Sequence, residues 1–151
     1  MDDSLTSPSE TSPSTVRFET RIVVILRDDL ANWQRANATA FLVSGIAAGE
    51  PGTVGEPYED ASGNRYLPMF REPVYVYAAT GDELIRAAGR ARSREVPFAL
   101  FTDDLFTTGH DGANRAAVRS VAVDDLSFVG IAFRTDRRVA DKITKGLGFH
   151  A

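Results

Sequence analysis

The sequence predicts an α/β fold: a mixed, mostly parallel sheet of about four core strands with helices on both faces. The first observation is the run of five large aliphatic residues at 22–26, which is typical of a strand covered on both faces. The second is the alternation of strand-like and helix-like segments along the chain. Because crossovers between parallel strands are right-handed, this alternation places helices on both faces and predicts a three-layer α/β/α sandwich.

The first elements follow from local signals. The opening strand is expected at 21–26, and a helix is predicted over 31–48, because helix formers continue to the glycine and proline cluster at 49–52. Residues 58–60 and 65–67 flank Ala-Ser-Gly-Asn, which predicts a small hairpin insertion outside the main sheet.

The strand and helix pattern then repeats. Pro73 precedes a strand at 74–78, and the spacing from Thr80 to Glu83 is that of a capping box at the start of a helix that ends near Arg94. The remaining elements are expected to be a strand, a short helix, a strand and a final helix, at 98–102, 112–121, 127–133 and 136–145.

Composition limits the domain organisation and the compartment. Residues 1–16 are rich in Ser, Thr, Pro and acidic residues and predict a disordered tail, which leaves a single domain over 17–151. The domain has an ordinary globular composition, with 43% apolar and 25% charged residues in the whole chain. No apolar run approaches the roughly 18 residues that span a bilayer. A cytoplasmic protein with no membrane partner is therefore expected.

Charge and the lack of cysteine argue against several kinds of chemistry. The formal net charge is -4 and the pI is about 5.2, which argues against a nucleic-acid partner because phosphate binding depends on clustered Lys and Arg. Zero cysteines exclude disulfides and thiolate ligands, and two histidines leave little for a metal site. No metal and no cofactor are expected.

The polar loop at 102–110 is the part of the chain richest in reactive side chains. Ligands of α/β sheets bind beyond the carboxyl ends of strands, and such ends are expected at 27–30, 79–81, 103–110 and 134–136. In the loop, Asp103 or Asp104 could act as a base, Thr107 or Thr108 could position water, and His110 could exchange a proton near neutral pH. Asp and Thr are equally typical of turns, because their side chains bond to local backbone groups. Both interpretations stay open.

The first helix carries a mixed stripe. The 3.6-residue period places Trp33, Asn37, Phe41 and Ser44 on one face, which is expected to be partly buried. Asn37 is the unusual member, because a buried amide must find hydrogen-bond partners. It is either a satisfied core amide or a group that orients a ligand in a cleft.

Asp28 and Asp29 lie where the first strand gives way to the first helix. Asp29 fits a helix N-cap, where a carboxylate accepts the free amide hydrogens and opposes the positive end of the helix. Together with Asp103 and Asp104, the pair could instead hold a divalent cation through oxygen ligands, although no metal-binding motif is present.

Four segments of the chain carry a resemblance to a known family. They are RIVVILRDDL followed by a long helix, FTDDLFTTGH, FVGIAF and DKITKGLGFH. Together they resemble the type II peptidyl-tRNA hydrolase fold, over about residues 21–150. The strings NATAFLVSG, YEDASG, LFTTGH and DKITKGL more closely resemble an uncharacterised bacterial branch of that fold, the domain of unknown function DUF2000.

The resemblance implies a three-layer α/β/α domain, commonly a homodimer, that cleaves the ester joining a peptide to tRNA. The working residues of the hydrolases include a lysine early in the first helix and an aspartate and a threonine after a core strand. Asp103 and Thr107 occupy the matching places. Residues 31–37 contain no lysine, and Arg35 is the only cation there. Because arginine can bind phosphate but does not exchange a proton at neutral pH, loss of the inherited hydrolysis is expected.

The leading hypothesis is a protein that binds a small molecule of unknown identity and no longer hydrolyses tRNA esters. Its ligand-binding residues are expected in the first helix and the turn before it: Asp28, Asp29, Trp33, Arg35 and Asn37. The first alternative is a hydrolase of a peptidyl or aminoacyl ester, with Asp103, Thr107 and His110 as its catalytic residues. The second is a non-catalytic homo-oligomeric regulatory or scaffold protein.

Overall fold

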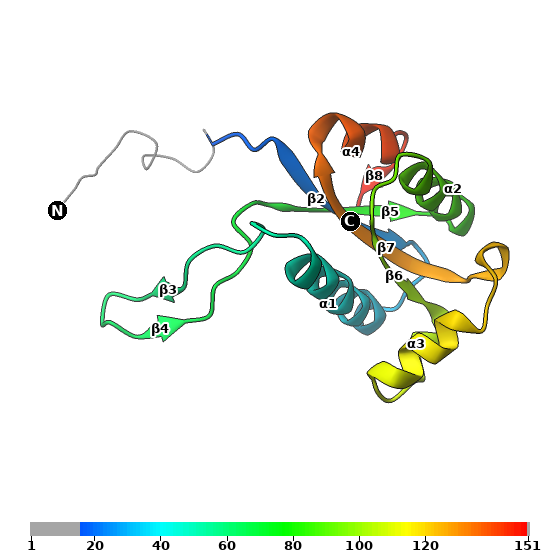
Figure 1. Ribbon diagram of the computed structural model, residues 1–151, viewed down its shortest axis with the longest axis horizontal. Helices are drawn as coiled ribbons and strands as arrows, with labels where there is room; N and C mark the ends of the chain where they lie inside the picture. The colour runs from blue at the N-terminus through cyan, green and yellow to red at the C-terminus, as the bar shows by residue number, and fades with distance from the viewer. Residues whose placement is uncertain (1–15, 151) are drawn as a thin grey trace.

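A computed structural model describes residues 16–150, and the predicted tail lies almost entirely outside these residues. The predicted α/β sandwich is confirmed: five strands form one sheet in the order β6-β7-β2-β5-β8, with helices on both faces (Figure 1). The strands of this sheet are β2 (Thr20–Arg27), β5 (Val74–Ala79), β6 (Ala99–Thr102), β7 (Phe128–Asp136) and β8 (Gly148–Phe149). The helices are α1 (Asn32–Gly49), α2 (Gly81–Ser93), α3 (Asp111–Arg119) and α4 (Arg137–Ile143), with short 3-10 helices η3 (Asp103–Phe106) and η4 (Val123–Asp125).

The aliphatic run predicted as the central strand lies at the middle of the sheet. β2 pairs with β5 on one side and with β7 on the other, and Ile22, Val23, Val24 and Ile25 are fully buried. Side chains of a strand point alternately to its two faces, so a strand that is apolar on both faces needs a cover on both. The helices supply these two covers.

The sheet is not mostly parallel, and that part of the prediction is wrong. Among neighbouring strands of this sheet, only β2 and β5 pair in parallel, whereas β7 is antiparallel to both β2 and β6, and β8 is antiparallel to β5. The reason is that α3 packs against η3 instead of crossing a face of the sheet (Figure 1), so the chain turns back directly from β6 to β7. The fifth strand, β8, is a two-residue strand that follows the turn at Gly146.

Two apolar clusters lie on opposite faces of the sheet. Under α1, Val24 and Leu26 of β2 pack with Leu42. On the other face, Val23 and Ile25 pack with residues of α2 and α4. Gly130 of β7 lets α1 approach closely, because a Cβ there would lie 2.9 Å from the carbonyl oxygen of Ile25 and 3.0 Å from the side chain of Leu42.

The predicted hairpin is confirmed as β3 (Tyr58–Glu59) and β4 (Arg65–Tyr66), which pair antiparallel in a separate two-stranded sheet. The hairpin is the outer part of an extended excursion, residues 50–73, which we call the arm. Figure 1 shows the arm reaching away from the sheet and its helices. Of the arm's residues, Phe70 alone packs against either of the two apolar clusters.

Strand directions decide which loops can share a site. β2, β5 and β6 point the same way, so the turn after β2, the turn before α2 and the segment Asp103–Phe106 lie at one edge of the sheet. The end of β7 lies at the opposite edge, because Asp136 pairs with Thr20 at the start of β2. Residues 134–136 therefore do not border the same site as the other three strand ends. Within residues 16–150, no helix is both long and apolar enough to cross a membrane.

Candidate functional site

A cleft of about 500 Å³ lies between α1 and the segment that runs from η3 into α3. The α1 side contributes Trp33, Asn37, Phe41 and Ser44, the four residues of the predicted stripe. The opposite wall is formed by Leu105, Phe106, Thr108, Gly109, His110, Asp111 and Asn114. The structure therefore brings the helix stripe and part of the polar loop to one place, although they lie far apart in the sequence.

The aromatic residues of the stripe are more exposed than expected. Trp33 is 61% exposed and Phe41 is 52% exposed, while the buried face of α1 is formed by Ala38, Leu42 and Ile46. The predicted burial of the stripe is wrong, because the smaller aliphatic residues fit against the sheet and turn the aromatic residues outward. The Trp33 ring meets the edge of the Phe106 ring at a centroid distance of 5.4 Å and an interplanar angle of 71°.

Asn37 lies one helical turn beyond Trp33 and is exposed. Its interpretation as a satisfied core amide is wrong, since among the described residues its side chain has no hydrogen-bond partner. The amide carries a donor and an acceptor side by side, and both are free to meet a molecule in the cleft. The assignment of Asn37 to a ligand stays a prediction.

His110 is held at the start of α3. Its Nδ1 accepts a hydrogen bond from the backbone N–H of Ala113 at 3.2 Å, as the N-cap of that helix. A ring nitrogen that accepts a hydrogen bond carries no proton, so in the neutral ring Nε2 bears the proton and is the donor available to the cleft. Gly112 leaves room for the His110 ring, because a Cβ at position 112 would lie only 3.4 Å from two atoms of that ring.

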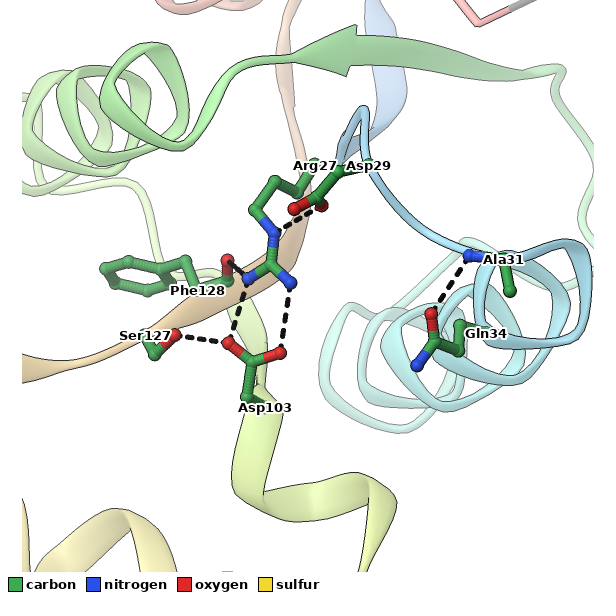
Figure 2. A network of polar contacts seen from close by, with 7 residues as sticks. All are labelled: Arg27, Asp29, Ala31, Gln34, Asp103, Ser127 and Phe128. Carbon is green, nitrogen blue, oxygen red and sulfur yellow. Dashed lines mark hydrogen bonds and ion pairs between the residues drawn. The ribbon is translucent and has the colours of Figure 1, made fainter.

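Asp103 is bound in an ion pair with Arg27 at the edge of the sheet (Figure 2), and we call these two residues the edge pair. Arg27 Nη1 and Nη2 donate to the two carboxylate oxygens of Asp103 at 2.9 and 3.0 Å. Nη1 also donates to the backbone oxygen of Phe128 at 2.9 Å, and the Ser127 hydroxyl donates to Asp103. The pair thereby joins β2 to β7 and to η3, which directly follows β6.

The edge pair changes what Asp103 can do. Its hydrogen bonds from Arg27, and secondarily from Ser127, lower the pKa of Asp103 below its ordinary value of 3.8. A carboxylate with a lowered pKa is a weak base at neutral pH, and Asp103 does not line the cleft. Thr107 is also outside the lining, and its hydroxyl donates to the carbonyl oxygen of Asp104 at 3.0 Å. Of the three residues expected to be catalytic in the hydrolase alternative, Asp103, Thr107 and His110, only His110 lines the cleft. Thr108, the other candidate for positioning water, lines it as well.

Asp28 and Asp29 lie beside the edge pair instead of at the helix start. Asp29 accepts a hydrogen bond from Arg27 Nε at 2.6 Å. Its predicted N-cap role is wrong, because α1 begins later: Ala31 is the N-cap, and its N–H donates to Gln34 Oε1 at 2.9 Å (Figure 2). Asp28 is exposed and its backbone N–H donates to Ala79 at 2.8 Å.

Arg35 does not line the cleft either. Its Nη1 donates to Asn32 Oδ1 at 3.3 Å, and its Nε is buried without a hydrogen-bond partner. Among residues 16–150, no three His, Asp or Glu side chains lie close enough together to hold a metal ion.

Comparison with known proteins places the chain in a family. The family model described as "Protein of unknown function (DUF2000)" matches residues 20–151. The chain belongs to the DUF2000 family. It is also similar to a solved structure of a protein of unknown function from Agrobacterium tumefaciens strain C58, with 45% sequence identity and a TM-score of 0.86 over 89% of this chain and 100% of the other. No curated protein matches the chain.

DUF2000 membership supplies no activity, and the likeness to peptidyl-tRNA hydrolases stays a prediction. Three residues of this DUF2000 protein matter to the site without having been assigned a role from the sequence. Arg27 and Phe106 lie within the strand ends expected at 27–30 and 103–110, and Asn114 was not predicted at all. Arg27 gave a usable signal, as the single charge that ends an aliphatic strand. Phe106 and Asn114 gave none, because their roles depend on how the segment between β6 and α3 folds.

Proposed function

We propose that this protein binds a small, planar heteroaromatic compound in the cleft between α1 and the η3–α3 segment. The observation that carries this proposal is the exposed Trp33 ring with the free Asn37 amide one turn away on the same wall. A large aromatic side chain left exposed beside a hollow is typical of a binding surface. The indole ring supplies a surface on which a planar ligand can stack, and the amide supplies hydrogen bonds that orient the ligand.

The cleft has the character of a small-molecule site. Its volume of about 500 Å³ falls within the range of ligand pockets, and its lining is about equally apolar and polar. Trp33, Phe41 and Phe106 give apolar area, while Asn37 and His110 can bond the rim of a ring. An Asn amide matches the adjacent donor and acceptor on the edge of a purine or of a carboxamide.

Binding accounts for the geometry better than ester hydrolysis. Hydrolysis by the route that the family resemblance implies would use Asp103 and Thr107, and both are engaged in contacts outside the cleft. The carboxylate faces a guanidinium that keeps it ionised and weakly basic. The net charge of -4 also disfavours a large polyanionic substrate.

The test uses Trp33, which is the single tryptophan of the chain, so tryptophan fluorescence reports on the cleft alone. The protein is titrated with a panel of free purine and pyrimidine bases and pyridine carboxamides. We expect at least one compound to quench Trp33 fluorescence in a saturable way. Asn37→Ala should then weaken binding about tenfold, or by about 1.4 kcal/mol, because the ring edge loses its amide partner.

Asn32→Ala is the matched control, since Asn32 lies on the same helix and contacts only Arg35 through its side chain. It should leave the affinity unchanged. If no compound of the panel quenches Trp33, or if the two Asn variants weaken binding equally, the proposed site is wrong.

A further inference from the structure

The arm is fixed to the domain by a buried ion pair at its root. Arg134 of β7 donates through Nε to Glu72 Oε2 at 3.1 Å and through Nη1 to the backbone oxygen of Pro51 at 3.2 Å. Glu72 also accepts from the Thr20 hydroxyl, and its side chain is 1% exposed. We call Arg134 and Glu72 the root pair. Arg134 therefore contacts residues at both ends of the arm. These contacts restrict movement of the arm relative to the sheet.

The outer part of the arm is also held in one shape. The Asp60 carboxylate accepts from the Tyr66 hydroxyl at 2.7 Å and from the backbone N–H groups of Ser62 and Asn64 at 2.9 Å. Nearer the root, the Gly55 N–H donates to Met69 and the Arg71 N–H donates to Thr53. The arm is a continuous, pre-organised ribbon.

The ribbon presents apolar side chains to solvent. Leu67 is 83% exposed, and the other large apolar side chains left exposed on the arm are Val54, Tyr58, Tyr66 and Met69. A hollow of about 350 Å³ on the arm is lined in part by Tyr58, Met69 and Phe70. The arm thus carries both an exposed apolar residue and a hollow whose lining is apolar in part, with Glu56 and Arg71 also bordering it.

A two-stranded hairpin on its own is at best marginally stable in water, and it gains stability by packing on a further layer. Figure 1 shows the hairpin reaching away from the sheet and helices of its own chain. The sheet and helices of residues 16–150 therefore do not supply such a layer.

We propose that the arm pairs with the arm of a second copy of this chain around a twofold axis. In a twofold interface the same patch meets itself, so Leu67 of each copy can fill the hollow of the other. The exposed apolar side chains offer on the order of 500 Å² in each copy. Two arms together bury on the order of 1,000 Å², about the least that a specific interface needs.

Charges on the rim of the arm are compatible with this pairing. Glu56 and Glu59 lie on the same ribbon as Arg65 and Arg71, and Glu59 is opposite Arg65 in the β-ladder. A surface that carries both signs can set opposite charges together when it meets its own copy, whereas a surface of one sign repels itself.

The test is the mass of the full chain in solution, by light scattering after size exclusion and by sedimentation equilibrium. The unaltered protein should have twice the monomer mass of 16.4 kDa. The double substitution Leu67→Asp and Met69→Asp should weaken the dimer by about tenfold or more, because it places charge in the interface core. Val123→Asp is the matched control, since Val123 is 53% exposed but lies outside the arm.

Hydrogen exchange keeps the test decisive if the double variant folds poorly. Backbone amides of residues 58–66 in the unaltered protein should become more protected as its concentration rises through the dimerisation range. Any of three results would overturn the proposal. The unaltered protein could be a monomer, the arm substitutions could weaken the dimer no more than Val123→Asp does, or the protection of the arm amides could be independent of protein concentration.

Discussion

Two arginine–carboxylate pairs brace opposite edges of the same sheet, and they differ in their exposure to water. The root pair, Arg134 with Glu72, includes a carboxylate side chain that is 1% exposed. The edge pair, Arg27 with Asp103, includes one that is 44% exposed. A buried ion pair is costly to break because the charge that remains stays buried. When one partner of a half-exposed pair is removed, water solvates part of the remaining charge, so the loss of stability is smaller. The comparison implies that the arm is held rigidly to the sheet, whereas the strand ends near the cleft can change conformation at a lower cost in free energy.

The largest effect is expected at the root pair. Glu72→Ala should lower the free energy of unfolding by about 3–5 kcal/mol, because the guanidinium of Arg134 is left buried and uncompensated. Urea unfolding monitored by circular dichroism measures this change. Glu56→Ala, which removes an exposed glutamate from the same arm, should change it by less than about 0.5 kcal/mol. Similar losses in the two variants would show that the root pair is not a brace.

The edge pair should matter less. Arg27→Ala is expected to lower the free energy of unfolding by about 1–2 kcal/mol, since water screens Asp103 even though the two hydrogen bonds are paired and charged. A double-mutant cycle with Asp103→Ala should give a smaller coupling energy than the corresponding cycle for Arg134 and Glu72. The reverse order of the two coupling energies would contradict the comparison.

The edge pair should also give the protein an acid-dependent stability. The pKa of Asp103 is lowered in the folded state from its ordinary value of 3.8, so its stabilising effect is fully present above that value and is lost as the pH falls through the lower, folded pKa. The difference in unfolding free energy between the unaltered protein and Asp103→Asn should be constant above about pH 5 and shrink below about pH 4. A difference that grows on acidification would refute this assignment.

The smallest effect is expected at the exposed turn of the arm, where Asp60 has no arginine partner among the described residues. The Tyr66 hydroxyl first, and then the hydrogen bonds from Asn64, lower the pKa of Asp60 to about 2. Tyr66→Phe should raise this pKa toward 3.8, because the largest of its causes is removed. An NMR titration of the Asp60 carboxyl measures it. An unchanged pKa would show that the phenol does not hold the turn.

Local signals in the sequence were sufficient for much of the fold. The capping box is present, with Thr80 N–H donating to Glu83 at 2.8 Å and Glu83 N–H donating to Thr80 at 3.2 Å. The aliphatic run at 22–26 and the hairpin turn are likewise decided by neighbouring residues. These elements were predicted correctly because nothing distant in the chain competes with their local preference.

The rest depended on packing between distant segments. The direction of β7 follows from where α3 packs, and the rotation of α1 follows from how Leu42 fits over Gly130. The same applies to the candidate site. Asp103 has the composition and position of a catalytic acid–base group in the sequence, but Arg27, 76 residues earlier, binds its carboxylate. No spacing rule connects two such residues before the sheet order is known.

The most direct test of the proposed cleft is a two-dimensional ¹⁵N NMR spectrum of the full chain, recorded while a purine or pyridine carboxamide is added. The chain has one tryptophan and therefore one indole N–H signal. Binding in the cleft predicts that this signal and the side-chain amide of Asn37 move together in a saturable way, while the side-chain amide of Asn64 on the arm stays in place. A bound compound that moves Asn64 and leaves the Trp33 indole unchanged would contradict the proposed site.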